Sequence, residues 1–387
     1  MTETSAAAVI AHSGGPTAVL NASLLGVVEE ITRQGLPRLY GARFGIDGIL
    51  ADDFIELSRM PDAKLRSISQ APSSALGTTR REIVPADLER VLDVLRAREI
   101  RYFFYNGGNG SMGTALQVDA AARQAGYDLQ VIGIPKTIDN DLLEVDHTPG
   151  YGSAARFFAS ALRDIDADNR ALRGQVEIVE VLGRNTGWLA AATLFARTSP
   201  ESGPHLIYFP EERLPLQKLL TDVEAVYRQL NRCVVAVCEG QLDEHEEPFG
   251  ADVRAGSRGS LAMNLGHRLA KLITQHLKLR ARSEKPGLLG RCCSAFISDT
   301  DWREARACGE AAVRAAISGA SAQMVTILRE PGEPYRIGTG LVDLERVAFL
   351  ERPFPKEWRT PEISANGGAF AEWAAPVIGE IRPHEFF

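Results

Sequence analysis

Residues 100–125, "IRYFFYNGGNGSMGTALQVDAAARQA", contain the clearest indication of the fold. Its first seven residues form an apolar, aromatic-rich run that is typical of a buried strand. Residues 111–125 have the composition of an amphipathic helix, and a turn of glycines and one amide separates the two segments. A strand that passes through a tight turn into a helix predicts one half of a βαβ unit.

The same alternation recurs along the chain and predicts an α/β fold with mainly parallel sheets. A chain of 387 residues is long enough for two domains. The other predicted strands cover 6–12, 129–135, 176–183 and 232–240, and the predicted helices cover 18–31, 111–125, 152–168, 186–197 and 260–277.

Composition excludes several classes of function. The net charge of −7 argues against a nucleic-acid partner, because phosphate backbones require a basic surface. The N-terminal "MTETSAAAVIAH" has neither a basic leader nor a membrane-length apolar run, so we expect no membrane partner. An odd number of cysteines, five, without paired spacing predicts reduced thiols and a cytoplasmic location.

Two glycine-rich turns, "HSGGPTAVLNAS" (12–23) and "GGNGS" (107–111), follow predicted strands. Such turns let the backbone approach an anion, and the N-terminus of the next helix offers unpaired N–H groups. Neither turn has the spacing of a dinucleotide fingerprint or of a P-loop, so an NAD-dependent dehydrogenase has little support. The alternative for either turn is a simple strand-to-helix connection.

The sharpest signal is "IPKTIDNDL" (134–142). Asp139 and Asp141 are two residues apart, so in an extended chain they point to the same side. One carboxylate could take a proton from a hydroxyl while the other holds a metal ion. Lys136 adds a positive charge and Thr137 a hydroxyl; the alternative is an Asx-rich turn.

Charged residues also follow the later strands: Arg184 in "EVLGRNTGW", Glu239 in "CEG", and Arg282 and Arg291 in "RSEKPGLLGRC". Arginine suits phosphate because its planar fork donates two hydrogen bonds at once. Each could instead be a surface ion-pair partner, and only the position at strand ends favours function.

Taken together and in this order, these segments and "TPGYGSAARF" resemble the 6-phosphofructokinase family over residues 7–380. The resemblance implies two Rossmann-like domains with the active site between them. It implies phosphoryl transfer to the 1-hydroxyl of fructose 6-phosphate, giving fructose 1,6-bisphosphate in glycolysis. It also implies Mg²⁺ and a homo-oligomer, a dimer or tetramer.

The resemblance assigns roles by position. The larger domain, 1–150 with a returning C-terminal segment, would bind donor and metal; 151–330 would bind the sugar phosphate, and 331–387 would wrap the outside. Asp139 would be the general base, assisted by Asp141, Thr137 and Arg184. The remaining assignments are donor binding by Gly14, Gly15, Arg80, Gly108, Asn109, Gly110, Ser111 and Lys136; sugar binding by Thr137, Gly183, Arg184, Glu239, Arg282 and Arg291; and metal binding by Asn109, Asp139 and Asp141.

The phosphoryl donor divides the family, and the sequence favours pyrophosphate over ATP. Lys136 stands where ATP users often have glycine, and Ile46 and Arg81 stand where ATP users stack adenine between aromatic rings. Gly110 points the other way, because pyrophosphate users usually carry aspartate there.

Three residues depart from the family pattern. Asn109 replaces a metal-linked aspartate, and an amide is a weaker, neutral ligand for Mg²⁺. Leu288 stands where the family often places tyrosine or histidine, which leaves a longer ketose phosphate such as sedoheptulose 7-phosphate as a candidate. Asn109, Gly113 and Leu288 also allow a non-catalytic paralogue that only binds sugar phosphate, although the complete "PKTIDND" counts against it.

Overall fold

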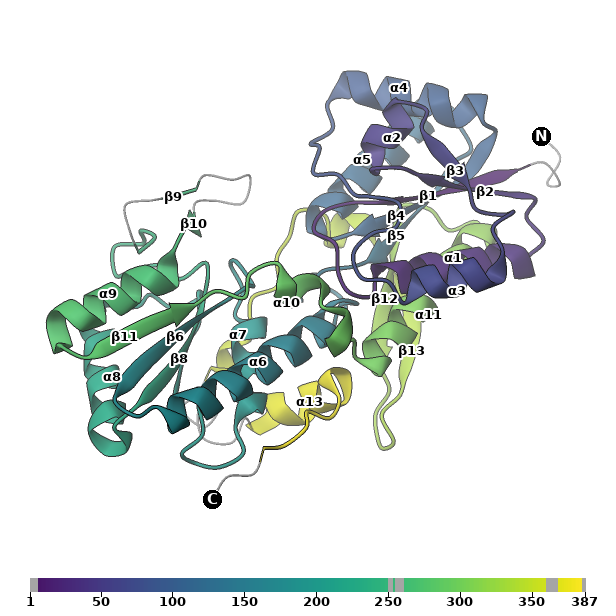
Figure 1. Ribbon diagram of the computed structural model, residues 1–387. Coiled ribbons are helices and arrows are strands. Elements are labelled where there is room, and N and C mark those ends of the chain that lie inside the picture. The colour runs from purple at the N-terminus through teal and green to yellow at the C-terminus, as the bar shows by residue number, and fades with distance from the viewer. Residues whose placement is uncertain (1–5, 250–252, 255–260, 360–367, 385–387) are drawn as a thin grey trace. The chain divides into compact units, whose positions relative to one another are not determined.

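A computed structural model describes residues 6–249, 253–254, 261–359 and 368–384 (Figure 1). The chain divides into two compact units, Met1–Tyr151 with Cys292–Arg352 and Gly152–Arg291 with Pro353–Phe387. The predicted second domain, 151–330, therefore ends too late, because 292–330 belong to the first unit. The reason is that these residues supply a helix and a strand to the first unit's sheet, which the alternation pattern had not revealed.

The first unit is built on a seven-stranded sheet in the order β13-β12-β5-β4-β1-β2-β3. The five inner strands run parallel, and only the two edge strands, β3 and β13, are antiparallel to their neighbours. The strands are β1 (Ala7–His12), β2 (Arg38–Ala42), β3 (Phe54–Glu56), β4 (Ile100–Gly107), β5 (Gln130–Pro135), β12 (Gln323–Arg329) and β13 (Ile337–Asp343).

Helices cover both faces of this sheet, so the central strands are apolar on both sides and all six residues of β1 are buried. One face carries α1 (Leu20–Arg33), α3 (Asp62–Ser69) and α11 (Asp299–Ile317) (Figure 1). The other carries α2 (Ile46–Leu50), α4 (Pro85–Ala97) and α5 (Asn109–Gln124).

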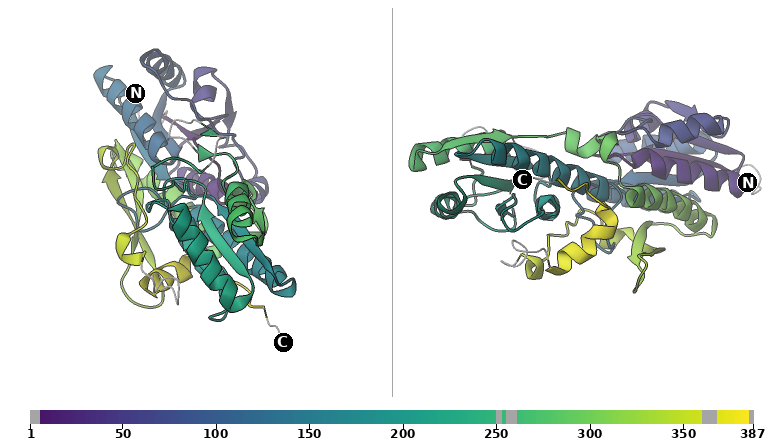
Figure 2. Two further views of the ribbon diagram at one scale, coloured as in Figure 1. Left: turned by 90° about the vertical axis from the view of Figure 1, so that its left-hand side faces the viewer. Right: turned by 60° about the horizontal axis from the view of Figure 1, so that its bottom comes forward.

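Helices α1 and α11 come from distant parts of the sequence and pack side by side (Figures 1 and 2). Two glycines permit this close approach. A Cβ atom at Gly26 would overlap the carbonyl oxygen of Arg306, and one at Gly309 would overlap that of Ser23. The crossing therefore requires the smallest side chain on both helices.

The second unit has a four-stranded parallel sheet in the order β11-β6-β8-β7. Helices α8 and α9 pack with β6 and β8 around an apolar core, and α7 contacts β7 and β8. The strands are β6 (Gln175–Val181), β7 (Leu206–Tyr208), β8 (Cys233–Cys238) and β11 (Arg280–Glu284), with a separate pair, β9 (Val253–Arg254) and β10 (Leu261–Ala262); the helices are α6 (Tyr151–Ala171), α7 (Trp188–Ala192), α8 (Leu216–Leu230), α9 (Leu265–Leu277), α10 (Leu289–Cys292) and α13 (Gly368–Ile378).

The C-terminal segment joins the second unit through aromatic packing. The ring of Phe354 stacks on Phe209 at 5.3 Å between centroids, and Trp188 meets Phe354 edge-on at 5.1 Å. Trp358 and Phe370 extend the cluster, so a set of large apolar rings packs the described parts of this segment together.

The predicted α/β class with mainly parallel sheets is confirmed. Each predicted strand is present with its ends shifted by at most two residues, while the predicted helix 260–277 starts later, at Leu265. Within the part of the chain that the structure describes, no helix is long and apolar enough to cross a membrane. The structure describes all five cysteines and shows no disulfide between them.

Candidate active site

Lys136 holds the first glycine turn from beneath. Its buried ammonium donates hydrogen bonds to the carbonyl oxygens of Ser13 and Gly15, both at 2.7 Å. Gly14 has φ of +79°, and a Cβ atom there would lie 3.3 Å from Nζ. Burial and then the charge of Lys136 lower the pKa of His12 to about 3. The turn thus carries a buried positive charge directly against its backbone.

Two backbone N–H groups of this turn bond within the protein. Ser13 donates to the carbonyl of Asn106 and Gly14 to that of Thr79, both at 2.8 Å. The Gly14 amide is therefore already bonded within the protein, and the predicted donor binding by Gly14 and Gly15 stays a prediction. The turn can attract an anion through the positive charge of Lys136. Arg80, which follows Thr79, is exposed.

The second glycine turn starts a helix as expected. Helix α5 begins at Asn109, directly after Gly108, so the N–H groups of its first turn have no partners within the helix. Ser111 is buried beside Gly107, whereas a Cβ atom at Gly110 would meet nothing within 4 Å. A helix N-terminus with an open space beside it suits an anion.

Asn109 is buried at 3% exposure and faces the backbone. Its Nδ2 donates to the carbonyl oxygen of Asp141 at 3.1 Å and to that of Leu350. Its Oδ1 is buried and has no hydrogen-bond partner among the described residues. The amide thus combines an anchored N–H side with an oxygen that remains available as a ligand.

The segment with the two predicted catalytic carboxylates is not extended. Asn140, between Asp139 and Asp141, adopts φ of +53°, a left-handed conformation that asparagine tolerates. Its Oδ1 accepts the N–H of Thr148 at 2.9 Å, which fixes this turn. The prediction that Asp139 and Asp141 point to the same side assumed an extended chain, and that assumption was wrong. The two side chains also differ in burial, because Asp139 is half-buried whereas Asp141 is 1% exposed.

Thr137 contributes to the shape of this turn. Its hydroxyl oxygen accepts the N–H of Asp139 at 3.0 Å, and its carbonyl accepts the hydroxyl of Thr148 at 2.9 Å. Thr137 also forms a parallel bridge with Gly150. The predicted substrate contact of Thr137 stays a prediction, while its local bonds explain how Asp139 is presented.

A buried ionic network supports the same loop, and sequence reasoning missed it. His147 is fully buried, with Nδ1 2.8 Å from Asp146 and Nε2 2.5 Å from Glu304 on α11. Burial alone would lower the pKa of His147, but the two carboxylates raise it to about 9. Arg329 and Tyr335 complete the network at Asp146 and Glu304.

In the second unit, Arg184 follows β6 in a strained conformation. Its φ is +50°, and the preceding Gly183 has φ of +133°. The thiol of Cys238 donates to the carbonyl of Arg184 at 3.4 Å, and a Cβ atom at Gly240 would overlap that carbonyl. The Nε atom of Arg184 is buried without a hydrogen-bond partner in the described part of the chain.

Glu239 lies in a cluster of charges at the end of β8. Burial and then Glu180 raise the pKa of Glu239, while Lys285, Arg184 and Arg291 oppose this rise. Lys285 pairs with Glu180 at 2.5 Å. The structure therefore brings together Arg184, Glu239 and Arg291, as predicted, and adds Glu180 and Lys285, which the predicted list omitted.

Arg282 lies apart from this cluster. It is exposed on the edge strand β11, in register with Glu177. Burial and then Glu284 raise the pKa of Glu177 to about 7, and Arg282 opposes the rise. Glu177 precedes the end of β6 by four residues, about 13 Å of strand, so Arg282 does not join Glu239 within one chain.

The positions compared with adenine-stacking residues offer no ring. Ile46 is fully buried, and Arg81 is paired with Asp87 at 2.8 Å. Phe44, which the sequence did not single out, is 53% exposed and covers Gly77. Leu288 is 68% exposed and so fills no apolar pocket of its own unit.

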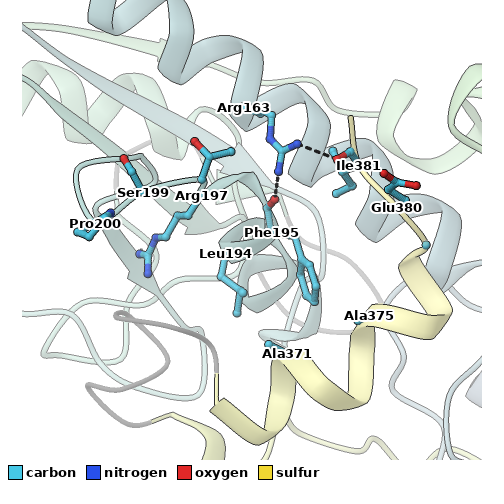
Figure 3. Close-up of a pocket in the computed structure, with 12 residues that line it drawn as sticks. Arg163, Leu194, Phe195, Arg197, Ser199, Pro200, Ala371, Ala375, Glu380 and Ile381 are labelled. Carbon is cyan, nitrogen blue, oxygen red and sulfur yellow. Dashed lines mark hydrogen bonds between the residues drawn. The ribbon is translucent and has the colours of Figure 1, made fainter. Parts of the chain in front are cut away.

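A pocket of about 630 Å³ in the second unit contains none of the predicted site residues (Figure 3). Figure 3 shows Arg163 with its guanidinium directed at the carbonyls of Phe195 and Ile381, at 2.6 and 3.0 Å. It also donates to the carbonyls of Ala196 and Arg382. Because these bonds attach the C-terminal segment to the unit, we interpret the pocket as a packing seam.

The described residues contain no group of three or more His, Cys, Asp or Glu side chains that could hold a metal ion. The predicted metal ligands would supply two carboxylates, from Asp139 and Asp141, and the amide oxygen of Asn109, and their binding of a metal stays a prediction. Such a sparse set fits Mg²⁺, which usually keeps several waters and binds through one or two carboxylates plus substrate phosphates.

Comparison with known proteins identifies the family of this chain. The family model described as phosphofructokinase matches residues 7–316. This chain belongs to the phosphofructokinase family. Phosphoryl transfer requires positioning and charge neutralisation more than covalent chemistry.

Relatives in the family match nearly the whole chain. Pyrophosphate–fructose 6-phosphate 1-phosphotransferase of Rhodospirillum rubrum is 38% identical, covering 98% of this chain and 95% of the relative. The crystal structure of pyrophosphate-dependent phosphofructokinase from Marinobacter aquaeolei has a TM-score of 0.87 at 33% identity, covering 98% and 94%. Sulfofructose kinase of Alkalicoccus urumqiensis is 32% identical, covering 95% and 94%. Relatives named ATP-dependent 6-phosphofructokinase are 25–30% identical over 69–81% of the chain.

Proposed function

We propose that this phosphofructokinase transfers a phosphoryl group from pyrophosphate to the 1-hydroxyl of fructose 6-phosphate, giving fructose 1,6-bisphosphate. The observation that supports pyrophosphate as the donor is the position of the Lys136 ammonium, which lies 2.7 Å from the carbonyl oxygens of Ser13 and Gly15. A small, highly charged donor gains from such a fixed cation. The R. rubrum and M. aquaeolei relatives, both named for pyrophosphate, support the same donor.

Asp139 is the base in this proposal. Its carboxylate accepts the proton of the attacking hydroxyl, and the Thr137 bond to its N–H keeps the residue in place. The α5 N-terminus, from Gly108 to Ser111, binds donor phosphate oxygens. Arg184 neutralises charge on the transferring group, and its unpaired, buried Nε supports a role toward an anion.

Magnesium would be held by Asp139, Asp141 and the Oδ1 atom of Asn109. The ion would neutralise charge on the donor phosphates. The orphaned oxygen of Asn109 supports this set, because a buried polar atom without a partner costs free energy unless something binds it.

The sugar phosphate belongs to the second unit. Arg184, Glu239 and Arg291 lie within one charge cluster, which suits a ligand with both hydroxyls and a phosphate. Gly183 supplies the positive φ that the backbone before Arg184 requires, and sugar-phosphate binding by Gly183 and by Arg282 stays a prediction. We infer a homo-oligomer in the cytoplasm, which size-exclusion chromatography with light scattering would test.

ATP remains the second candidate donor, because two observations favour it. Gly110 leaves open space beside the α5 N-terminus, and Phe44 presents an exposed ring next to Gly77. An exposed aromatic ring beside a phosphate site can stack a nucleobase.

Initial rates with fructose 6-phosphate and Mg²⁺, measured separately with pyrophosphate and ATP, test the donor. We expect turnover with pyrophosphate at least tenfold above that with ATP. Gly110→Asp sharpens the result, because a Cβ atom there meets nothing and the fold should tolerate it. The variant should keep pyrophosphate activity within about threefold and lose any ATP activity by charge repulsion. Turnover with ATP alone would contradict the proposal.

The acceptor needs its own test, because Leu288 cannot donate a hydrogen bond and the A. urumqiensis relative is named for sulfofructose. Rates with fructose 6-phosphate, sedoheptulose 7-phosphate and 6-deoxy-6-sulfofructose should rank fructose 6-phosphate first. Binding without turnover by any acceptor and either donor would instead indicate a non-catalytic paralogue.

A further inference from the structure

We propose that Asn109 and Arg352 are positioning residues that clamp the backbone around Asp141. The proposal rests on the phosphotransferase function above. It assigns Asn109 a second role beside its candidate metal contact, and it gives a role to a segment after β13 that carries no recognisable motif.

The orientation of the Asn109 amide is forced by its neighbours. Two carbonyl oxygens, those of Asp141 and Leu350, lie within hydrogen-bond distance of the same side-chain atom. That atom must be the nitrogen, since only an N–H group can bond to a carbonyl oxygen. An aspartate at this position would place a carboxylate oxygen against two carbonyls and repel both.

Arg352 holds the same loop from the other side. Its backbone N–H donates to the carbonyl of Asp141 at 2.8 Å, so this oxygen accepts from both Arg352 and Asn109. Its guanidinium donates to the carbonyl of Asn140 at 3.0 and 3.2 Å and to that of Asp146 at 3.1 Å. It also reaches the carbonyl of Val145.

Burial lowers the pKa of Arg352 to about 10, so the side chain still carries its charge at neutral pH. Its guanidinium donates hydrogen bonds to the carbonyl oxygens of three residues, Asn140, Val145 and Asp146. A planar fork that spans these carbonyls fixes both ends of the turn that contains Asp141.

The clamp segment, Phe349–Arg352, is itself seated on α5. The N–H of Phe349 donates to the carbonyl of Asn109 at 3.2 Å. The Phe349 ring occupies the space above Gly113, where any Cβ atom would overlap it. Gly113 is thereby explained as the seat of this ring, and it no longer suggests a lost function.

The choice of asparagine follows from these contacts. Asparagine keeps one oxygen toward the metal position and uses its nitrogen to hold the Asp141 backbone. Aspartate would be the stronger Mg²⁺ ligand but has no N–H to donate. The clamp therefore predicts that Asn109→Asp lowers kcat, whereas a purely ligating role predicts that kcat is retained and Mg²⁺ binds more tightly.

The clamp is tested without activity by a double-mutant cycle on the metal-free protein. Urea unfolding would be measured for wild type, Asn109→Ala, Arg352→Lys and the double variant. Because the Asn109 amide and the Arg352 guanidinium hold the adjacent carbonyls of Asp141 and Asn140, we expect non-additive effects, with a coupling of at least fivefold in the unfolding equilibrium constant. Additive effects would overturn the clamp.

The positioning role is tested by kinetics of Asn109→Asp in the full-length enzyme. We expect kcat to fall at least tenfold with the KM for fructose 6-phosphate within about twofold, and half-saturation by Mg²⁺ no lower than in wild type. Retained kcat with Mg²⁺ half-saturation lowered several-fold would show that Asn109 is only a ligand. Asn109→Ser, which keeps one donor, should recover part of kcat and replaces the aspartate variant if that fails to fold.

Asn169 provides a matched control in the second unit. It is equally buried, and its Nδ2 donates to the carbonyl of Gln175 at 3.3 Å. Asn169→Asp should change stability but leave kcat within about twofold; an equal kcat loss would overturn the specific role of Asn109. If wild type shows no turnover, the proposed function fails, while the unfolding cycle still decides the clamp.

Discussion

The loop around Asp139 in the first unit and the loop around Arg184 in the second both follow a parallel strand, but they are held differently. The first is fixed by hydrogen bonds to its backbone from Asn109 and Arg352. The second is fixed by steric fit, with Gly183 and Arg184 at positive φ. The first loop is thus held by several hydrogen bonds, whereas the second is held mainly by the lack of space around its backbone.

These two ways of fixing a loop predict different responses of the two units to a bound ligand. Hydrogen bonds to carbonyls leave the carboxylates of the first loop in place before any substrate arrives. In the second, the raised pKa of Glu239 shows that burial and Glu180 disfavour its charge despite three nearby cations. We therefore expect a phosphate to change the electrostatics of the second loop more than those of the first.

The largest effect is expected from a substitution that removes the proposed base from the first loop and keeps the geometry of that loop. Asp139→Asn should lower kcat by about 10²–10⁴-fold, because an amide cannot accept the proton of the attacking hydroxyl. Binding of fructose 6-phosphate, measured by calorimetry, should change by less than about threefold. A variant that keeps more than a tenth of wild-type kcat would remove Asp139 from the role of base.

A pH series tests the ionic network behind the first loop. The pKa of His147 rises from 6.5 to about 9, so its stabilisation is fully present below pH 6.5 and is lost as pH rises through about 9. At about 1.4 kcal/mol for each pKa unit, wild type should lose up to about 3 kcal/mol relative to His147→Gln by pH 10. Urea unfolding of both proteins at pH 6.5, 8 and 10 measures this difference. A difference in unfolding free energy that does not change with pH would refute the charged network.

The smallest effect concerns the confined loop. Gly240→Ala places a Cβ atom on the carbonyl of Arg184, so we expect a loss of about 1–3 kcal/mol in unfolding free energy and a higher KM for the sugar phosphate. Gly338→Ala is the control, because its nearest neighbour would lie 3.8 Å away. It should change stability by less than about 0.5 kcal/mol and leave KM unchanged. Equal effects of the two variants would show that the Arg184 loop is not sterically confined.

Local pattern predicted much of the fold. Strands such as 100–106 and 129–135 were found from apolar runs because helices on both faces make central strands apolar throughout. The strands β11 and β13 were not predicted, since exposed edge strands such as Arg280–Glu284 carry no such run. The return of Cys292–Arg352 to the first unit depends on long-range pairing that no local period encodes.

The alternating strands and helices, the glycine turns at their ends, and the charged residues Lys136, Asp139, Arg184 and Glu239 could all be read from local composition and spacing. The folded chain was needed to show that the Gly14 amide is already bonded, that Asn140 turns the chain between two aspartates, and that Asn109 and Arg352 meet at the Asp141 carbonyl. The physical reason is that hydrogen bonds between distant backbone and side-chain groups depend on the folded path of the chain, which residue spacing alone does not specify.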